Sequence, residues 1–197
     1  KFSFPTYHQD PVADLIRFML HEVKEDWNTR DWRSKAVLYA SNRSRFMSQM
    51  QNLLAIPGNV VVCDRFVSSN QGHMGALSED KEERQKRYAW IDHLEFEMMG
   101  LPRPDIVLLH TMPSEMREKL LHKRENGNPD AHECNSAYLD RVEKAYFELM
   151  DFYPNTWRHI PADQDGVLQT PEEVHERVKS ALLFHPKWVE FSAKKSI

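Results

Sequence analysis

The chain has 197 residues, and its 26 lysine and arginine side chains against 30 aspartate and glutamate side chains give a formal net charge of −4. This length suits one soluble domain, and the absence of a long apolar run excludes a membrane-spanning helix. The mild acidity argues against a protein that coats nucleic acid through bulk positive charge, so any phosphate ligand would be held locally.

The chain is poor in cysteine, with Cys63 in an apolar run and Cys134 in a polar stretch. Two such residues do not form a disulfide framework. A reducing, cytoplasmic compartment is therefore the expectation.

The first third of the chain alternates between short apolar runs and amphipathic segments. Asp10 ahead of Pro11 is typical of a helix N-terminus, and Pro57-Gly58 is typical of a helix end. The unbroken run of three β-branched valines and a cysteine at 60–63 predicts a strand buried on both faces of a parallel sheet. The predicted elements are, in chain order, a strand over 1–4 stopped by Pro5, a helix from Pro11, a polar connector over 27–33, a helix over 36–54 and a strand over 60–63.

The rest of the chain continues the alternation of strand and helix patterns. Gly100 follows a helical segment as a C-terminal cap does, and the opening Thr170-Pro171-Glu172-Glu173 combines a cap, a first-turn proline and acidic residues at a helix N-terminus. The predicted elements are a solvated loop or helix start over 78–87, a helix over 90–99, a strand over 106–110, a helix over 114–123 capped by Ser114, a mobile loop over 124–135, a helix over 138–150, a strand over 156–160 and a helix over 170–183.

Strands that alternate with helices predict parallel βαβ units and hence an α/β fold, a three-layer α/β/α sandwich with a parallel sheet. We expect one domain over 1–183 followed by a C-terminal extension over 184–197. In such sheets ligands bind beyond the carboxyl ends of the strands, which favours the residues that follow Phe4, Cys63 and His110.

The pair Asp64-Arg65 follows the predicted buried strand directly. An aspartate there can hold a hydrated Mg²⁺ and an arginine can clamp a phosphate, which are the parts that phosphoryl transfer needs. The pair could equally be an ion pair that ends the strand. The dipeptide alone leaves both interpretations open.

Several segments match the motifs of one enzyme family in the same order along the chain. The run Asp64-Arg65-Phe66-Val67-Ser68-Ser69-Asn70-Gln71-Gly72-His73-Met74-Gly75-Ala76 resembles D-R-Y/F-x-x-S-x-x-A-Y/F-Q/T-G-A, the signature of the thymidylate kinase family. Further matches to that family are Leu38-Tyr39-Ala40-Ser41-Asn42-Arg43, Gly100-Leu101-Pro102-Arg103-Pro104-Asp105, Met112-Pro113 with Lys123-Arg124, and the segment from Tyr138 to Tyr146. Together they span residues 4–183.

The resemblance implies a P-loop kinase fold and ATP-dependent, Mg²⁺-assisted phosphorylation of dTMP to dTDP by direct in-line transfer. Tyr39 would stack on the thymine ring, and Arg43 would hydrogen-bond its carbonyl edge. Arg65 would grip the acceptor phosphate, Asp64 would hold Mg²⁺ through water, and Ser69 would orient Asp64 or the base.

The resemblance also implies a lid over 124–135, with Arg124 at its base acting on ATP and on the transferring phosphoryl group. His73 would lie near the sugar and disfavour a 2′-hydroxyl. The remaining positions implied at the substrate are Phe4, Pro5, Gly72 and Met74. Met74 stands where the family carries Gln or Thr, and the segment Asp130-Ala131-His132-Glu133 lacks the lid arginine of some bacterial members.

No G-x-x-x-x-G-K-[ST] phosphate loop occurs in the 197 residues. We expect the central first strand of the sheet and this loop, with its lysine, to lie upstream of Lys1, because a sheet without its central strand would expose two strand edges. The alternatives are a non-catalytic nucleotide-binding relative and a kinase for another nucleoside or nucleoside monophosphate.

The partner molecules implied by the resemblance are the nucleotides dTMP and ATP and a second copy of the chain, because members of the family commonly pair as homodimers. We expect no nucleic acid and no membrane partner.

Overall fold

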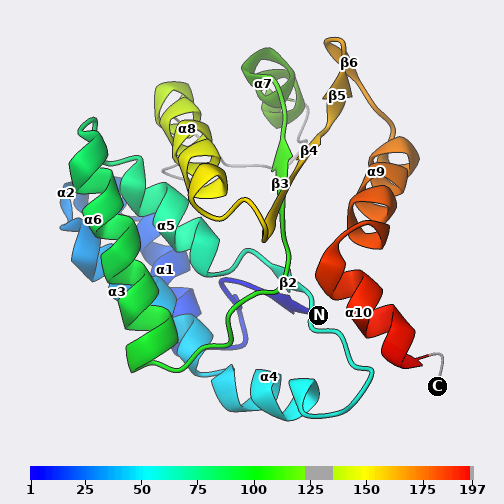
Figure 1. Cartoon of the computed structure of the whole chain (residues 1–197). Coiled ribbons are helices and arrows are strands. Elements are labelled where there is room, and N and C mark those ends of the chain that lie inside the picture. Colours follow the sequence, from blue (N-terminus) through cyan, green and yellow to red (C-terminus); the bar gives the residue numbers. More distant parts are fainter. Residues whose placement is uncertain (123–134, 196–197) are drawn as a thin grey trace. The chain divides into compact units, whose positions relative to one another are not determined.

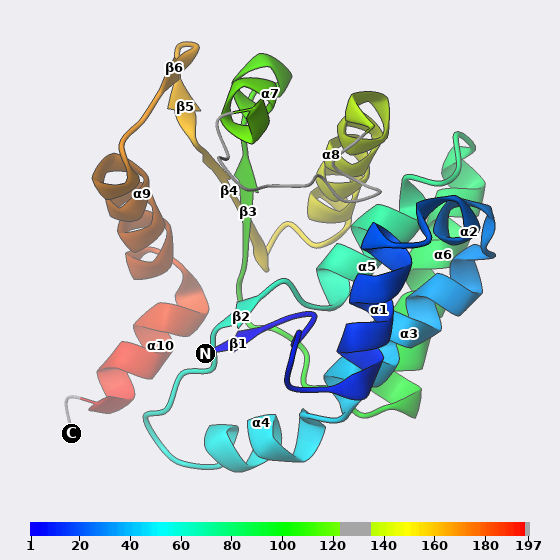
Figure 2. The same ribbon diagram turned by 180° about the vertical axis from the view of Figure 1, so that it is seen from behind.

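The computed structural model describes residues 1–122 and 135–195 (Figures 1 and 2). The chain folds into two compact units, each with its own buried residues and its own pair of parallel strands. Unit 1 comprises the described residues of Lys1–Arg103 and Asn128–Tyr146, and unit 2 those of Pro104–Gly127 and Phe147–Ile197. Helix α8 (Ser136–Phe152) belongs to unit 1 as far as Tyr146 and to unit 2 from Phe147.

Unit 1 is mainly helical around one short strand pair. Strands β1 and β2 are parallel, with Phe2 opposite Cys63 and Ser3 opposite Asp64, so both carboxyl ends lie at the same edge. Besides the first part of α8, its elements are β1 (Phe2–Ser3), α1 (Pro11–His21), α2 (Lys24–Thr29), α3 (Trp32–Ser44), α4 (Met47–Leu54), β2 (Cys63–Asp64), α5 (Val67–Gly75), α6 (Lys81–Asp92) and the π-helix η1 (His93–Met98).

Three helices of unit 1 begin at an aspartate whose carboxylate accepts hydrogen bonds from free backbone N–H groups of the first turn. Asp10 accepts hydrogen bonds from the N–H groups of Val12 and Ala13 at the start of α1. Asp31 and Asp80 cap α3 and α6 in the same way. Each cap satisfies donors that have no partner within the helix. The prediction that Asp10 caps the first helix is confirmed.

The core of unit 1 lies where α3, α5 and η1 meet the strand pair. Phe2 and Phe4 of the first segment pack with Phe46, whose ring stands edge-on to both. Helices α1, α3, α5 and α6 run side by side along this core (Figures 1 and 2). The fully buried members of the cluster include Ala36, Met50, Met74 and Ile91.

Unit 2 holds the longer strand pair, β3 (Val107–Thr111) and β4 (Trp157–Pro161), which is also parallel. A β-hairpin of β5 (Asp163–Gln164) and β6 (Val167–Leu168) follows, and its turn uses Asp165 and Gly166 at φ 51° and 76°, the left-handed conformation that two-residue hairpins need. The helices that unit 2 adds to the end of α8 are α7 (Ser114–His122), α9 (Pro171–Leu183) and α10 (Pro186–Lys195).

The structure confirms the predicted α/β class with parallel strands, and several element boundaries as well. Thr170 caps α9 in a complete capping box with Glu173, and proline takes the first helical position. Gly100 closes the helical segment at φ 69°. No helix in the described ranges 1–122 and 135–195 is long and apolar enough to span a bilayer.

Two helix predictions in the first third are wrong. Residues 27–33 are not a polar connector, because α2 contains Trp27, whose side chain is fully buried against α1. The helix predicted over 36–54 begins at Trp32 and breaks between α3 and α4, where Phe46 leaves helical geometry to reach the core.

The strand predicted over 60–63 is also wrong in extent and burial. Hydrogen-bonded pairing begins only at Cys63, while Val60 and Val62 are 51% and 55% exposed. Among the described residues, β2 pairs with β1 alone. The Ser-, Asn- and Gly-rich segment that follows, which carried no helical signal, forms α5 because its buried contacts override propensity.

The C-terminal extension forms α10, joined to α9 through a fully buried histidine. The Nε2 of His185 lies 2.8 Å from the backbone oxygen of Asn155, and its Nδ1 accepts from the N–H of Lys187. The extension therefore has a specific attachment within unit 2.

A close contact at Gly75 of α5 provides a test of this packing. A Cβ there would lie 2.4 Å from a ring carbon of the buried Tyr88. We expect Gly75→Ala to lower the free energy of unfolding by about 1–3 kcal/mol, because overpacking outweighs the helix propensity that alanine adds. Urea denaturation measures this, with Ser68→Ala on the same helix as control; a stabilised Gly75→Ala variant would contradict the packing described.

Candidate functional site

The predicted site begins at the edge where β1 and β2 end. The Oγ of Ser3 donates a hydrogen bond to the Oδ2 of Asp64 at 3.2 Å, and the N–H of Phe4 donates to the backbone oxygen of Asp64 at 2.9 Å. The structure thus brings together the segments after Phe4 and Cys63, as strand-end reasoning predicted. The peptide bond between Phe4 and Pro5 is cis.

Arg65 lies directly after this edge in an unusual conformation. Its φ of 60° places a long side chain in the left-handed region that favours glycine, at a cost of about 1–3 kcal/mol. Its guanidinium is exposed, and its Nη1 lies 3.4 Å from the Nε2 of His73. A strained backbone that presents an exposed arginine is typical of functional sites.

His73 connects Arg65 to α8. Its Nδ1 lies 3.0 Å from the hydroxyl of Tyr138, and that hydroxyl donates to the backbone oxygen of His73 at 3.2 Å. All three contacts are satisfied by the neutral tautomer with the proton on Nδ1, because Nε2 then accepts from the arginine. Arg65, which is predicted to bind the acceptor phosphate, and His73, which is predicted to lie near the sugar, are therefore in contact.

Ser69 and Gly72 make room for a second tyrosine of α8. A Cβ at Gly72 would lie 2.6 Å from the ring of Tyr146, so a larger residue would require this ring to shift. Burial raises the pKa of Tyr146 above its ordinary value, while a hydrogen bond with Ser69 and the charge of Arg65 lower it by less. Ser69 is thus engaged by Tyr146.

Arg43 of α3 is buried and forms a two-pronged ion pair with Glu95 of η1. Its Nε lies 2.6 Å from Oε2 and its Nη2 lies 2.6 Å from Oε1. Glu95 is fully buried. Because the pair uses Nε and Nη2, Nη1 is left without a hydrogen bond in the part of the chain that the structure describes.

Asn70 of α5 joins the same carboxylate. Its Nδ2 donates to the Oε1 of Glu95 at 2.7 Å and to the backbone oxygen of Ala36 at 3.0 Å. These two acceptors fix the orientation of the Asn70 side-chain amide, because only its nitrogen can donate to them. Its Oδ1 is then a buried acceptor without a donor among the described residues, a group that a ligand N–H would satisfy.

The loop after β1 is tied to the helix that carries Arg43. Asn42 accepts from the N–H of Thr6 at 3.2 Å and donates to the Oγ1 of Thr6 at 2.7 Å, and both residues are buried. The predicted segment at Phe4 and Pro5 is therefore held against α3 at Asn42, the residue directly before Arg43.

Tyr39 of α3 is half-buried, with its ring edge-on to the buried Trp27 at a centroid distance of 5.8 Å. The ammonium group of Lys35 lies 5.6 Å from the centre of the Trp27 ring, and burial lowers the pKa of Lys35 below its ordinary value. The predicted base-stacking ring is thus fixed in position by an aromatic neighbour.

Two predicted substrate-binding side chains lie in the core instead of at a surface. Met74 is fully buried, and Phe4 is 3% exposed within the same cluster. Both side chains pack against other residues of this cluster, and the contact of Phe4 and Met74 with the substrate stays a prediction. Both support the backbone that carries their neighbours.

Asp64 is the one predicted metal-binding residue. Its carboxylate is exposed and accepts one hydroxyl hydrogen bond. Across residues 1–122 and 135–195 no group of three or more His, Cys, Asp or Glu side chains could hold a metal ion. A single carboxylate fits Mg²⁺, which keeps several waters and binds through one or two carboxylates and substrate phosphates.

Two predictions lie outside the described residues. Arg124 and the predicted lid, apart from Asn135, fall on positions that the structure does not describe. Asn135 accepts from the N–H of Tyr138 at 2.9 Å and thereby caps α8.

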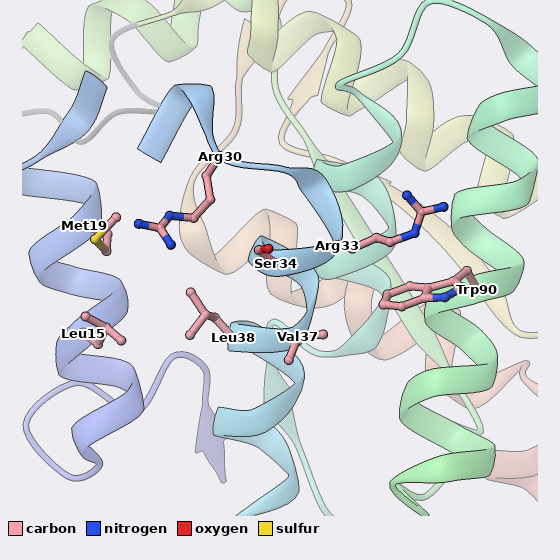
Figure 3. Close-up of a pocket in the computed structure, with 8 residues that line it drawn as sticks. All are labelled: Leu15, Met19, Arg30, Arg33, Ser34, Val37, Leu38 and Trp90. Atoms are coloured by element: carbon pink, nitrogen blue, oxygen red, sulfur yellow. The ribbon is translucent and has the colours of Figure 1, made fainter. Parts of the chain in front are cut away.

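A cavity of about 450 Å³ lies elsewhere in unit 1 and contains none of the predicted site residues. Arg30 extends across it toward α1 and Arg33 toward α6 (Figure 3). Its lining is mostly apolar: Leu15, Met19, Arg30, Arg33, Ser34, Val37, Leu38 and Trp90. The cavity is thus separate from the predicted nucleotide site.

Sequence reasoning assigned no role to Glu95, Asn70, Tyr138 or Tyr146. A carboxylate between Leu94 and Phe96 in a helical segment is the one signal that could have identified Glu95 as buried. Asn70 and the two tyrosines lie inside matched motifs, but the sequence does not show which residues they contact. Those contacts depend on how the helices pack.

Comparison with known proteins identifies relatives. A family model described as thymidylate kinase matches residues 2–178. The thymidylate kinase of Mycobacterium tuberculosis is 28% identical over 168 residues, covering 83% of this chain and 77% of the relative. That of Clostridium novyi is 28% identical over 178 residues, covering 87% and 78%.

Solved structures agree in fold. The thymidylate kinase of Candida albicans superposes with a TM-score of 0.68 at 21% identity, covering 92% of this chain and 77% of that one. The thymidylate kinase of Ehrlichia chaffeensis superposes with a TM-score of 0.58 at 14% identity.

The buried ion pair makes a stability prediction. We expect Arg43→Met to lower the free energy of unfolding by about 3–5 kcal/mol, because it leaves the Glu95 carboxylate buried without its cation. The double variant Arg43→Met/Glu95→Met removes both charges and should recover most of this loss. Urea denaturation of the three proteins decides the matter; a single variant as stable as the wild type would contradict the pairing.

Proposed function

The chain belongs to the thymidylate kinase family, whose members are nucleoside monophosphate kinases, and on that premise we propose that it transfers a phosphoryl group from ATP to dTMP. One observation supports the choice of thymine as the base. The carboxylate of Glu95 binds both the buried Arg43, which keeps free N–H donors, and the amide of Asn70, which keeps a free acceptor. The scarcity of cysteine supports a reducing compartment, the cytoplasm.

The donor and acceptor complement one edge of thymine. Thymine offers the O4 acceptor next to the N3–H donor, so Nη1 of Arg43 would donate to O4 and Oδ1 of Asn70 would accept from N3–H. Cytosine offers a donor at N4 and an acceptor at N3. The N4 donor would then face the Nη1 donor of Arg43, and the N3 acceptor would face the Oδ1 acceptor of Asn70. Tyr39 would supply the stacking face.

The other end of the nucleotide would lie at the β1–β2 edge. Arg65 would bind the acceptor phosphate with its planar fork, and its contact with His73 directs it. His73, held by Tyr138, would stand near the sugar and exclude a 2′-hydroxyl. Ser69 and Gly72 would support this end through Tyr146.

Catalysis would come from positioning and from neutralising charge, because direct in-line phosphoryl transfer needs no covalent enzyme intermediate. Mg²⁺ held through water by Asp64 would supply charge neutralisation at the phosphates. Arg65 would hold the attacking phosphate in line, and Arg124 would bind the transferring group and ATP. The lid over 124–135 would exclude water.

The activity is tested by ADP release from the full-length protein with ATP and Mg²⁺, using dTMP, dUMP and dCMP as acceptors. Fast turnover with dTMP and poor turnover with dCMP is the expected result. Turnover of dCMP equal to that of dTMP would contradict the assignment of the base site, and absence of turnover with all three would contradict the kinase proposal.

Arg65→Ala tests the phosphate site. We expect kcat/KM for dTMP to fall by about 10³-fold or more, because the phosphate loses a bidentate charged partner at the reacting end. Arg65→Lys should recover only part of the rate, since a point charge lacks the fork. Arg17→Ala, on the exposed side of α1, is the control; a near-normal rate for Arg65→Ala would refute the role.

We also propose that the chain forms a homodimer through the face of α1, α3 and α6 that borders the 450 Å³ cavity. Leu15 and Val37, which line that cavity together with Trp90, are 46% and 40% exposed, and Phe18 of α1 is 48% exposed. A cluster of exposed large apolar side chains on adjoining helices is typical of an interface. A second copy would cover it through a two-fold axis, on which each contact occurs twice.

Val37→Glu tests the dimer. We expect the dimer dissociation constant to rise by about 100-fold or more, because the symmetric contact would bury two unpaired carboxylates. Analytical ultracentrifugation over a concentration series gives the constant. Val167→Glu, on the exposed hairpin of unit 2, is the control; an unchanged dimer in Val37→Glu, or a monomeric wild type, would refute the proposed interface.

A further inference from the structure

Glu95 is the buried centre of the base site, and its helical turn has an unusual form. It lies in the π-helix η1, where the N–H of Met99 bonds the backbone oxygen of Leu94 five residues earlier. Such turns are rare and frequently occur at functional sites. This one presents a fully buried carboxylate to α3 and α5.

The carboxylate accepts three hydrogen bonds from two helices. It receives Nε and Nη2 of Arg43 and Nδ2 of Asn70, all at 2.6–2.7 Å. The charge of the guanidinium is thereby neutralised, and the N–H groups left for a ligand are the two of Nη1 and the second of Nη2. A neutral pair with free N–H donors suits an uncharged ring, whereas an unpaired buried arginine would favour a phosphate or carboxylate.

Glu95 also sets the orientation of Asn70. A carboxylate accepts only, so the amide must turn its nitrogen toward Glu95 and its oxygen away. The backbone oxygen of Ala36 acts in the same direction. A side chain at 95 that could donate would permit the amide to turn over, and a donor would then replace the acceptor at the free position.

We propose that Glu95 is a positioning residue that determines base specificity: it sets Arg43 as donor and Asn70 as acceptor, and so selects the thymine edge over the cytosine edge. This inference rests on the proposed function. Glu95 acts through the two other side chains and does not touch the nucleotide.

A merely structural role for Glu95 makes a different prediction. The outer side of η1 is held by Arg103, which pairs with Asp92 and with Glu97 at 2.7–2.9 Å. Glu97 therefore serves the same turn from the exposed side without reaching Arg43 or Asn70. Glu97→Gln is the matched control for the integrity of the turn.

The experiment compares steady-state kinetics of the wild type, Glu95→Gln and Glu97→Gln with dTMP and dCMP, with ATP saturating. We expect Glu95→Gln to raise KM for dTMP by about tenfold or more, with kcat within about threefold, because the base contacts lie away from the reacting phosphate. The dTMP/dCMP ratio of kcat/KM should fall by about tenfold or more. Glu97→Gln should leave both unchanged.

Each outcome decides between the alternatives. An active wild type with an unchanged dTMP/dCMP ratio in Glu95→Gln overturns the role of Glu95 and leaves the kinase proposal standing. Equal losses on dTMP and dCMP, or the same loss in Glu97→Gln, also overturn it, because they indicate a structural effect. A wild type that does not phosphorylate dTMP overturns the proposed function and this inference together.

Folding of the variants is checked by circular dichroism and thermal melting. If Glu95→Gln does not fold, Glu95→Asp replaces it: the charge remains, but the side chain is one methylene too short to reach both partners. Asn70 then loses the acceptor that orients its amide, so the dTMP/dCMP ratio of kcat/KM should again fall, and an unchanged ratio overturns the proposal.

Discussion

The interaction on which unit 1 depends is the buried ion pair between Arg43 and Glu95. A lone carboxylate or guanidinium inside a protein costs several kcal/mol, so each can be buried only because the other is there. The pair joins α3 to η1, and Asn70 adds α5 to the same carboxylate. Three segments far apart in sequence thus meet at one charged centre, which also provides the free donor and acceptor of the proposed base site.

A second constraint acts at the opposite end of that proposed site. Because β1 and β2 are parallel, their carboxyl ends coincide, and the residues that follow them lie side by side. Arg65 leaves this edge in a left-handed conformation and meets His73, which α8 holds through Tyr138. The proposed function assigns this strand edge to the phosphate and the buried polar centre to the base, and phosphoryl transfer by positioning needs both ends of the nucleotide held.

Much of the fold was predictable from local sequence signals, namely helix caps, a glycine at a helix end and the alternation of strand and helix patterns. Caps at Asp10 and Thr170, the glycine stop at Gly100 and the alternation of strands and helices were all read correctly. Predictions failed where burial overrode local pattern. Trp27 made a polar-looking segment a packed helix, Phe46 broke a helix to reach the core, and exposed Val60 and Val62 did not join a strand.

The sequence by itself determined the family, through ordered motifs, and the residue types that can bind a phosphate and a base, because these follow from side-chain chemistry. It could not determine which of these side chains are exposed or to what they are paired. Met74 belongs to the motif but lies in the core, while Glu95 was given no role and lies at the centre of the proposed base site. Only the tertiary structure decided this, because a hydrogen bond between residues 52 positions apart depends on how helices pack.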